Sequence, residues 1–174
     1  MKTKTLIFIL FVFFSIDSFA QLKFDGKIDS KFKTFQLDDG SYKYVKYNKK
    51  EQVLFIYNID NSLWREVKMP LPKYHVLDEL KHISIHTFNQ DNLVELIYSC
   101  AVYSPNSNYQ DPNEDFFSVN FTLNIINELG ESILKVQDSN EMEIIDSNGE
   151  KKIIVYKHIG NGYKAKDETL IYSF

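Results

Sequence analysis

The sequence predicts an all-β protein built from antiparallel meanders, and three observations carry this prediction. Residues that favour strands are abundant, with 14 Phe and 11 Tyr among 174 residues. After the N-terminal apolar run, no segment combines a 3.6-residue apolar period with a cap over the length of a typical helix, and the best candidate, Val76–Lys81, is too short. All six glycines fall between candidate strands, where tight turns favour positive φ angles.

Candidate strands alternate with turn-rich segments along the chain. In residues 117–125, apolar and polar residues alternate, which predicts an antiparallel strand with one dry face and one polar face. In Val53–Tyr57, an uninterrupted apolar and aromatic run indicates a strand buried on both faces. The predicted strands are Lys31–Leu37, Tyr42–Asn48, Val53–Ile59, Leu63–Met69, His82–Phe88, Leu93–Tyr103, Phe116–Ile126, Ser132–Gln137, Met142–Ile145, Lys152–Lys157 and Thr169–Phe174.

Two of the predicted hairpins resemble each other. The first, Val53–Met69, carries the only tryptophan, Trp64. Ile56–Val67 aligns with Ile125–Val136 without a gap, and Ile133 then stands where Trp64 does. Because an aliphatic residue occupies the equivalent position, the alignment favours a core position for Trp64.

This alignment predicts a fold of serial units. We expect two similar four-stranded meanders at about 31–69 and 82–137, and a partial third unit at 142–174. Four-stranded meanders in series are the blades of β-propellers, in which each blade buries its faces against its neighbours. At about 40 residues a blade, this chain is too short for the smallest closed ring. The expected arrangement is therefore an open partial propeller, a two-sheet sandwich, or a chain that pairs with another copy.

The first 20 residues have the pattern of a secretory signal peptide. Lys2 and Lys4 precede the apolar run Leu6–Phe14, and the small residues Ser18 and Ala20 fit a cleavage site. The run is shorter than the roughly 20 apolar residues that a membrane-spanning helix needs. We therefore expect cleavage after residue 20. Residues 21–174 would then form a single exported domain, periplasmic or extracellular, without a membrane span.

Charge and cysteine content restrict the partners and the chemistry of this domain. Without residues 1–20, the chain has 18 basic and 23 acidic residues, and the basic residues form no cluster. This argues against nucleic acid and anionic lipid as partners. Cys100 is the only cysteine, so no intramolecular disulfide can form. We interpret it as a buried free thiol that packs like a small apolar residue.

Several turn and strand segments resemble a class of bacterial proteins. Asn58–Trp64 reads N-x-D-N-S-L-W, a proline-containing connection follows, and then come Thr87–Glu95 and Ile126–Gly130. In this order the segments resemble secreted exoproteins of Bacteroidetes-type bacteria that carry propeller-like β repeats. The resemblance covers most of residues 40–174. It implies a fold and export, but no activity, because its motifs are turn and core residues.

Aromatic residues of the first predicted meander are candidates for ligand binding. Tyr42, Tyr44, Tyr47 and Trp64 can form a platform that stacks on sugars or peptides while the tyrosine hydroxyls form hydrogen bonds. Packing in the core and across strands explains the same residues. Both interpretations stay open at this stage.

Two segments carry residue types that bind metal ions. Asp111, Asn113 and Asp115 offer the oxygen ligands that Ca²⁺ takes, although the segment lacks the glycine and the closing glutamate of a calcium loop, and a solvated polar loop is the alternative. His82 and His86 are four residues apart on a predicted strand. That spacing corresponds to about 13 Å, which is too far for one Zn²⁺ ion.

The sequence contains no familiar catalytic motif. It has no G-x-S-x-G elbow and no phosphate-binding glycine loop, and its acidic residues are scattered. We therefore expect an exported, non-enzymatic β-domain that binds protein or carbohydrate, or that has a structural role in the cell envelope. Two alternatives are an exported hydrolase that uses paired carboxylates and a structural module stabilised by Ca²⁺.

Overall fold

The computed structural model of this chain describes residue 24 and residues 32–89, 91–105, 117–160 and 166–174. The described residues form eleven strands and no helix, and all of these strands lie in one compact unit, Phe32–Phe174. The strands are β1 (Lys33–Gln36), β2 (Tyr42–Asn48), β3 (Val53–Tyr57), β4 (Leu63–Lys68), β5 (Val76–Ser84), β6 (Glu95–Pro105), β7 (Phe117–Asn127), β8 (Ser132–Gln137), β9 (Glu141–Ser147), β10 (Glu150–Ile159) and β11 (Lys166–Ser173).

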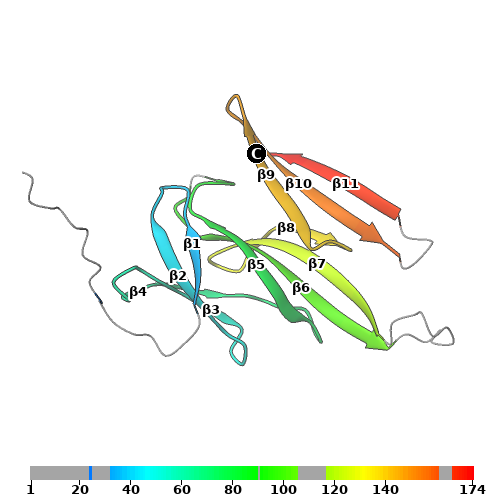
Figure 1. The fold of residues 1–174 in the computed structure, drawn as a ribbon, viewed down its shortest axis with the longest axis horizontal. Coiled ribbons are helices and arrows are strands. Elements are labelled where there is room, and N and C mark those ends of the chain that lie inside the picture. Colours follow the sequence, from blue (N-terminus) through cyan, green and yellow to red (C-terminus); the bar gives the residue numbers. More distant parts are fainter. Residues whose placement is uncertain (1–23, 25–31, 90, 106–116, 161–165) are drawn as a thin grey trace, which may run out of the picture. The chain divides into compact units, whose positions relative to one another are not determined.

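The strands form three open antiparallel sheets, each a meander of strands that are consecutive in the sequence (Figure 1). The first sheet has the order β1-β2-β3-β4 and the second sheet the order β5-β6-β7-β8. The third sheet has three strands in the order β11-β10-β9. The predicted all-β class is confirmed, and so are the two four-stranded meanders followed by three further strands.

Two apolar cores join the sheets, one on each face of the second sheet. In β6, alternate residues enter the two cores, with Leu96 and Tyr98 in the first core and Ile97 in the second. The first core lies between the first and second sheets, and the second core lies between the second and third. The buried residues of the first core are Leu37, Val45, Leu54, Ile56, Val67, Met69, Leu80, Ile83, Val94, Leu96, Tyr98 and Ile126, and those of the second core are Ile97, Leu123, Ile125, Val136, Ile153 and Val155.

Burial of the second sheet on both faces corrects one prediction for β7. Part of the predicted polar face is buried too, because Thr122 and Asn124 are only 6% and 7% exposed, whereas Asn120 on the same face is exposed. The Asn124 amide donates hydrogen bonds to the Thr122 carbonyl at 3.1 Å and to the Cys100 sulfur at 3.5 Å. Cys100 is a buried free thiol, as predicted, and burial raises its pKa. The second face is polar, as predicted, but the first sheet covers the part of it that carries Thr122 and Asn124.

The first sheet shows the opposite deviation. Residues of β3 alternate, and Leu54 and Ile56 are buried in the first core while Phe55 and Tyr57 stay partly exposed. The apolar run had indicated burial on both faces. The second face of β3 is covered only in part, with Val53 buried and Phe55 and Tyr57 half-buried, because among the described residues only one face of this sheet packs against another sheet.

The two hairpins aligned by sequence have the same turn. The Asn58 amide donates to the Ser62 carbonyl at 2.9 Å, and the Asn127 amide donates to the Glu131 carbonyl at 3.0 Å. The fourth residue of each turn has a left-handed backbone conformation. This residue is Asn61 in the first hairpin, with a φ of 67°, and Gly130 in the second.

The aligned hairpins also share a β-bulge. The pairing of β3 with β4 skips Trp64, and the pairing of β7 with β8 skips Ile133, the residue aligned with it. Trp64 packs against the first core, as the alignment favoured. The two hairpins that the sequence alignment paired therefore share a turn and a bulge in the structure. That the meanders are copies of one repeat stays a prediction.

Strand β5 begins and ends earlier than predicted. It covers Val76–Ser84 instead of His82–Phe88, and it includes the segment that had the best helical spacing. Pairing with β6 skips Asp78 and Lys81, so β5 contains two irregularities. Each extra residue interrupts the period of two, and the buried Leu80 and Ile83 therefore recur at three-residue spacing.

Two carboxylates replace strand pairing after β5. The Ile85 and His86 amides donate to Asp38, the latter at 2.6 Å. The Thr87 and Phe88 amides donate to Glu95, both at 3.1 Å to the same oxygen. Four successive backbone donors are thus satisfied by side chains, which explains why this segment is a bend and not the predicted end of a strand.

Glu95 is the fully buried member of this pair. Its side chain is 0% exposed, and it also accepts the Ser84 hydroxyl at 2.7 Å. In each of these contacts, an N–H or O–H group of the protein donates a hydrogen bond to a carboxylate oxygen of Glu95. An amide at this position would turn its own NH₂ group toward one of these donors.

We expect Glu95→Gln to lower the free energy of unfolding by about 2 kcal/mol, because the amide cannot accept all of these hydrogen bonds. Urea denaturation monitored by tryptophan fluorescence measures the change. Glu66→Gln, on an exposed position of β4, is the matched control and should stay within about 0.5 kcal/mol of the wild type. Equal stability of both variants would contradict a supporting role for the Glu95 carboxylate.

Candidate functional site

The four aromatic residues predicted to bind ligand lie on two different faces of the first sheet. Tyr47 is on the same face as Val45, and it packs against the first core together with Trp64. Tyr42 and Tyr44 alternate with these residues along β2 and therefore point away from the core. The structure thus does not bring the four residues together as one platform.

The two inward residues have structural surroundings. The Tyr47 hydroxyl is buried and has no hydrogen-bond partner among the described residues, and burial raises its pKa. The Trp64 ring faces two cations, with Lys43 Nζ at 4.6 Å and the Arg65 guanidinium carbon at 4.9 Å from the ring centre. These contacts occupy the ring, so Trp64 fits core packing better than ligand stacking.

The two outward tyrosines belong to a larger surface that we call the outer aromatic face. Tyr44 and Tyr57 are directly opposite each other on β2 and β3, and Phe32 packs edge-on against both, with ring centres at 6.1 Å and 5.9 Å. Tyr42 and Leu63 are 48% and 53% exposed. The outer aromatic face consists of Phe32, Tyr42, Tyr44, Phe55, Tyr57 and Leu63.

Polar side chains share this face with the aromatic rings. Thr34 is paired with Tyr44, and Gln36 is paired with Tyr42. Lys46 flanks Phe55 on the neighbouring strand. Aromatic rings with hydroxyl, amide and ammonium groups beside them can pack against an apolar ring face of a ligand and form hydrogen bonds with its polar edge.

The predicted calcium ligands Asp111, Asn113 and Asp115 lie outside the described residues, so the calcium site stays a prediction. His86 is exposed beyond the end of β5, so it does not share a strand face with His82 as expected. No group of three or more His, Cys, Asp or Glu side chains suited to a metal ion occurs among the described residues.

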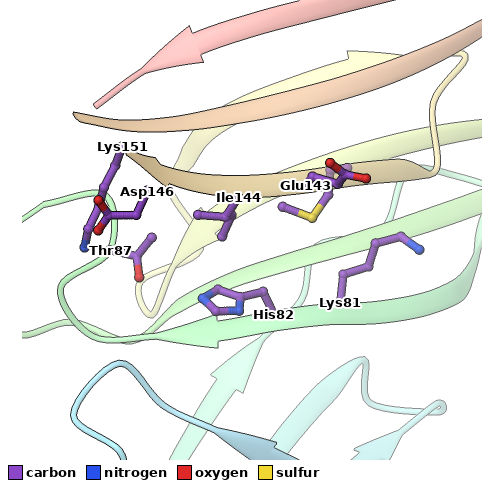
Figure 2. A pocket seen from close by; sticks show the side chains of 8 residues that line it. Lys81, His82, Thr87, Glu143, Ile144, Asp146 and Lys151 are labelled. Carbon is purple, nitrogen blue, oxygen red and sulfur yellow. The ribbon is translucent and has the colours of Figure 1, made fainter. Parts of the chain in front are cut away.

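A cavity between the second and third sheets is a second candidate site (Figure 2). Its volume is about 240 Å³. It lies between β5 and the segment after it on one side, and β9 and β10 on the other. The lining residues are Lys81, His82, Thr87, Met142, Glu143, Ile144, Asp146 and Lys151.

The cavity has an apolar middle and charged ends. Figure 2 shows His82 facing Ile144 in the middle, Lys81 and Glu143 at one end, and Asp146 and Lys151 with Thr87 at the other end. Asp146 and Lys151 are directly opposite each other on β9 and β10. Residues brought together here are about 60 positions apart in the sequence, and no local pattern marked them.

Lys81 is already engaged at its end of the cavity. Its ammonium donates to Glu79 at 2.6 Å, and Lys33 of β1 donates to the other oxygen of the same carboxylate at 3.0 Å. These two ammonium groups lower the pKa of Glu79 to about 2. The Lys81 ammonium is therefore already paired within the protein, although it shares the Glu79 carboxylate with Lys33.

His82 is the only cavity residue whose polar atom is both buried and without a partner among the described residues. The unpartnered atom is Nε2. Burial lowers the pKa of His82, and the charge of Asp38 opposes this effect in part. The ring is therefore neutral at pH 7. A neutral imidazole can donate or accept one hydrogen bond at Nε2.

Comparison with protein families, with curated proteins and with solved structures found no match for this chain. Among the described residues, no helix has the length and apolar character needed to cross a membrane. The functional argument therefore rests on the outer aromatic face and on the cavity.

The buried His82 predicts a pH dependence of stability. The pKa in the folded state lies below the ordinary value of 6.5, so below about pH 6.5 the unfolded chain binds a proton that the folded chain resists. We expect the free energy of unfolding to decrease as the pH falls from 7.5 to 5.5, and this component should be absent from His82→Leu. Urea titrations at three pH values measure it.

The matched control for this pH effect is His86→Gln. His86 is exposed, and this variant should keep the pH dependence of the wild type. A His82→Leu variant with the wild-type slope would show that other groups cause the effect.

Proposed function

We propose that this chain is an exported, non-enzymatic binding module of the cell envelope that binds carbohydrate through the outer aromatic face. The proposal includes its kinship with secreted, propeller-like exoproteins of Bacteroidetes-type bacteria, whose motifs it resembles. The single observation that carries the binding proposal is the gathering of aromatic side chains on one face of a sheet, where Tyr42 is exposed and Tyr44, Phe55 and Tyr57 are half-buried.

The composition of this face supports a sugar ligand. Large apolar side chains on a soluble domain are normally covered, and a contiguous exposed group marks an interaction surface. Sugar rings present apolar C–H faces and polar hydroxyl edges, which match tyrosine rings and the Thr34, Gln36 and Lys46 side chains. Neighbouring strands are about 4.8 Å apart, so Tyr44 and Tyr57 can contact one extended chain together.

A protein partner is the competing ligand for the same face. Protein interfaces are enriched in tyrosine and phenylalanine as well. However, Lys46 and Glu66 flank Phe55 from both sides, and charged residues are depleted at the centre of protein interfaces. Carbohydrate therefore fits this face better.

A hydrolase with paired carboxylates is the second candidate, and the cavity favours it in one respect. Glu143 and Asp146 line the cavity on either side of His82. Three residues along a strand span about 10 Å and place side chains on opposite faces, and catalytic carboxylates of glycosidases converge at about 5 to 9.5 Å. We therefore favour binding over hydrolysis.

Replacement of the outward tyrosines tests the binding proposal. We expect Tyr42→Ala and Tyr44→Ala to weaken binding to a neutral polysaccharide about tenfold each, which corresponds to about 1.4 kcal/mol. Affinity electrophoresis in gels that contain hydroxyethyl cellulose, laminarin or xylan measures the retardation. Tyr103→Ala, an exposed tyrosine of the second sheet, should retain binding.

Trp64→Ala separates binding from stability in the same assay. It should lower the stability of the domain and leave retardation of the folded protein unchanged, because Trp64 packs on the inner face. Wild-type protein that no polysaccharide retards, or a Tyr42→Ala/Tyr44→Ala variant that is retarded like the wild type, would contradict the proposal. Release of reducing sugar that Glu143→Gln abolishes would favour the hydrolase.

A further inference from the structure

Strand β11 forms one edge of the third sheet. Among the described strands, it pairs with β10 on one side and with no strand on the other (Figure 1). The first and second sheets continue at the corresponding place, because β3 and β7, the third strands of their meanders, are each paired with a fourth strand. The third sheet therefore presents a strand edge where the other two sheets have a further strand.

The backbone groups on this edge point away from β10. The Phe174 amide donates to the Lys151 carbonyl at 3.3 Å, so the even-numbered residues of β11 bond to β10. The N–H and C=O groups of the odd-numbered residues therefore point to the open side, and no hydrogen bond to them occurs among the described residues. The odd-numbered residues are Asp167, Thr169, Ile171 and Ser173.

The other edge strands have features that oppose pairing with a further chain, such as short length, bulges and charge. Strand β1 has only four residues, and β4, β5 and β8 each contain a bulge. Strand β9 carries Glu141, Glu143 and Asp146. In contrast, the eight residues of β11 pair with β10 without a bulge, and Thr169–Ser173 is an uncharged run. Strand β11 is thus the least protected edge among the described strands.

The sequence of β11 is complementary to itself in the antiparallel direction, because its charged residues all lie in its first half. A two-fold axis at Leu170 places Glu168 opposite Tyr172 of a second copy. It also places Thr169 opposite Ile171 of the second copy, and β-branched side chains pack well across strands. In this register no like charges are opposite each other, and the odd-numbered residues of the two strands exchange about eight hydrogen bonds.

We propose that two copies of this chain associate through β11 as an antiparallel strand pair. The third sheets of the two copies then form one continuous sheet. Each copy supplies the strand that β4 supplies in the first sheet and β8 in the second. The second copy covers part of Ile171, which is 64% exposed in the single chain. This surface is separate from the outer aromatic face, so the inference does not depend on carbohydrate binding.

Sedimentation velocity over a dilution series measures the association. One strand pair buries a small area, so we expect a dimer that dissociates on dilution. Amide hydrogen exchange locates the contact. The amides of Thr169 and Ile171 should exchange more slowly in concentrated than in dilute protein. The amides of Leu170 and Tyr172 bond to β10 and should be protected at both concentrations.

Two substitutions at one position test the strand pair. Ile171→Pro removes an N–H on the open edge without removing a hydrogen bond to β10, so the fold is retained. It should weaken association roughly tenfold, because the missing N–H and the proline ring disturb the ladder. Ile171→Lys should weaken association as well, since it places two ammonium groups at diagonal positions across the pair. Thermal melting monitored by circular dichroism verifies that each variant is folded.

Asp146→Pro is the matched control on the opposite edge of the same sheet. Asp146 lies on β9, and its cross-strand partner Lys151 bonds to β11 instead, so the Asp146 N–H also points away from β10. This variant should associate like the wild type. Equal weakening by Asp146→Pro and Ile171→Pro would overturn the proposal, because it would show a general effect of proline on the sheet.

Two further outcomes would overturn the proposal. A protein that is monomeric at every concentration would show that the β11 edge stays unpaired. A dimer that neither Ile171→Pro nor Ile171→Lys weakens would show that a different surface joins the copies. Tyr42→Ala/Tyr44→Ala should associate like the wild type, so loss of the dimer in this variant would assign the contact to the outer aromatic face instead.

Discussion

Burial of the second sheet on both faces is the constraint on which the rest of the structure depends. Leu96 and Ile97 are neighbours in β6, yet they enter different cores. A sheet whose two faces are both apolar cannot stay in water, so it requires a further sheet on each side. Among the described residues, the first sheet packs against another sheet on one face only, and this leaves the outer aromatic face partly exposed.

Side-chain carboxylates connect this layered core to the cavity. Asp38, from the turn of the first hairpin, and Glu95, from the start of β6, bind successive amides after β5. Thr87 is thereby fixed at one end of the cavity, while β9 and β10 contribute the opposite wall. The cavity is thus built where the second and third sheets meet, and its charged groups come from the strands that face each other there.

Local residue patterns were enough to predict most strands. Bulges explain why one strand, β5, was predicted with the wrong bounds. The predicted bounds of β2 and β8 agree with the structure because turn residues mark where each strand begins, with Gly40 before β2 and Gly130 before β8. In β5, two extra residues shifted the alternation and made a strand resemble a short helix. The segment after it was predicted as strand because hydrogen bonds to distant carboxylates leave no local pattern.

The sequence by itself determined the all-β class, the order of the meanders and the burial of Cys100, because strand propensity, turn residues and alternation act over a few neighbouring positions. Only the tertiary structure decided which face of each strand is covered. It separated Tyr42 and Tyr44 from Tyr47 and Trp64, and it brought His82 near Asp146 and Lys151. Such proximity depends on how sheets stack, and the contacts between stacked sheets join residues far apart in the chain.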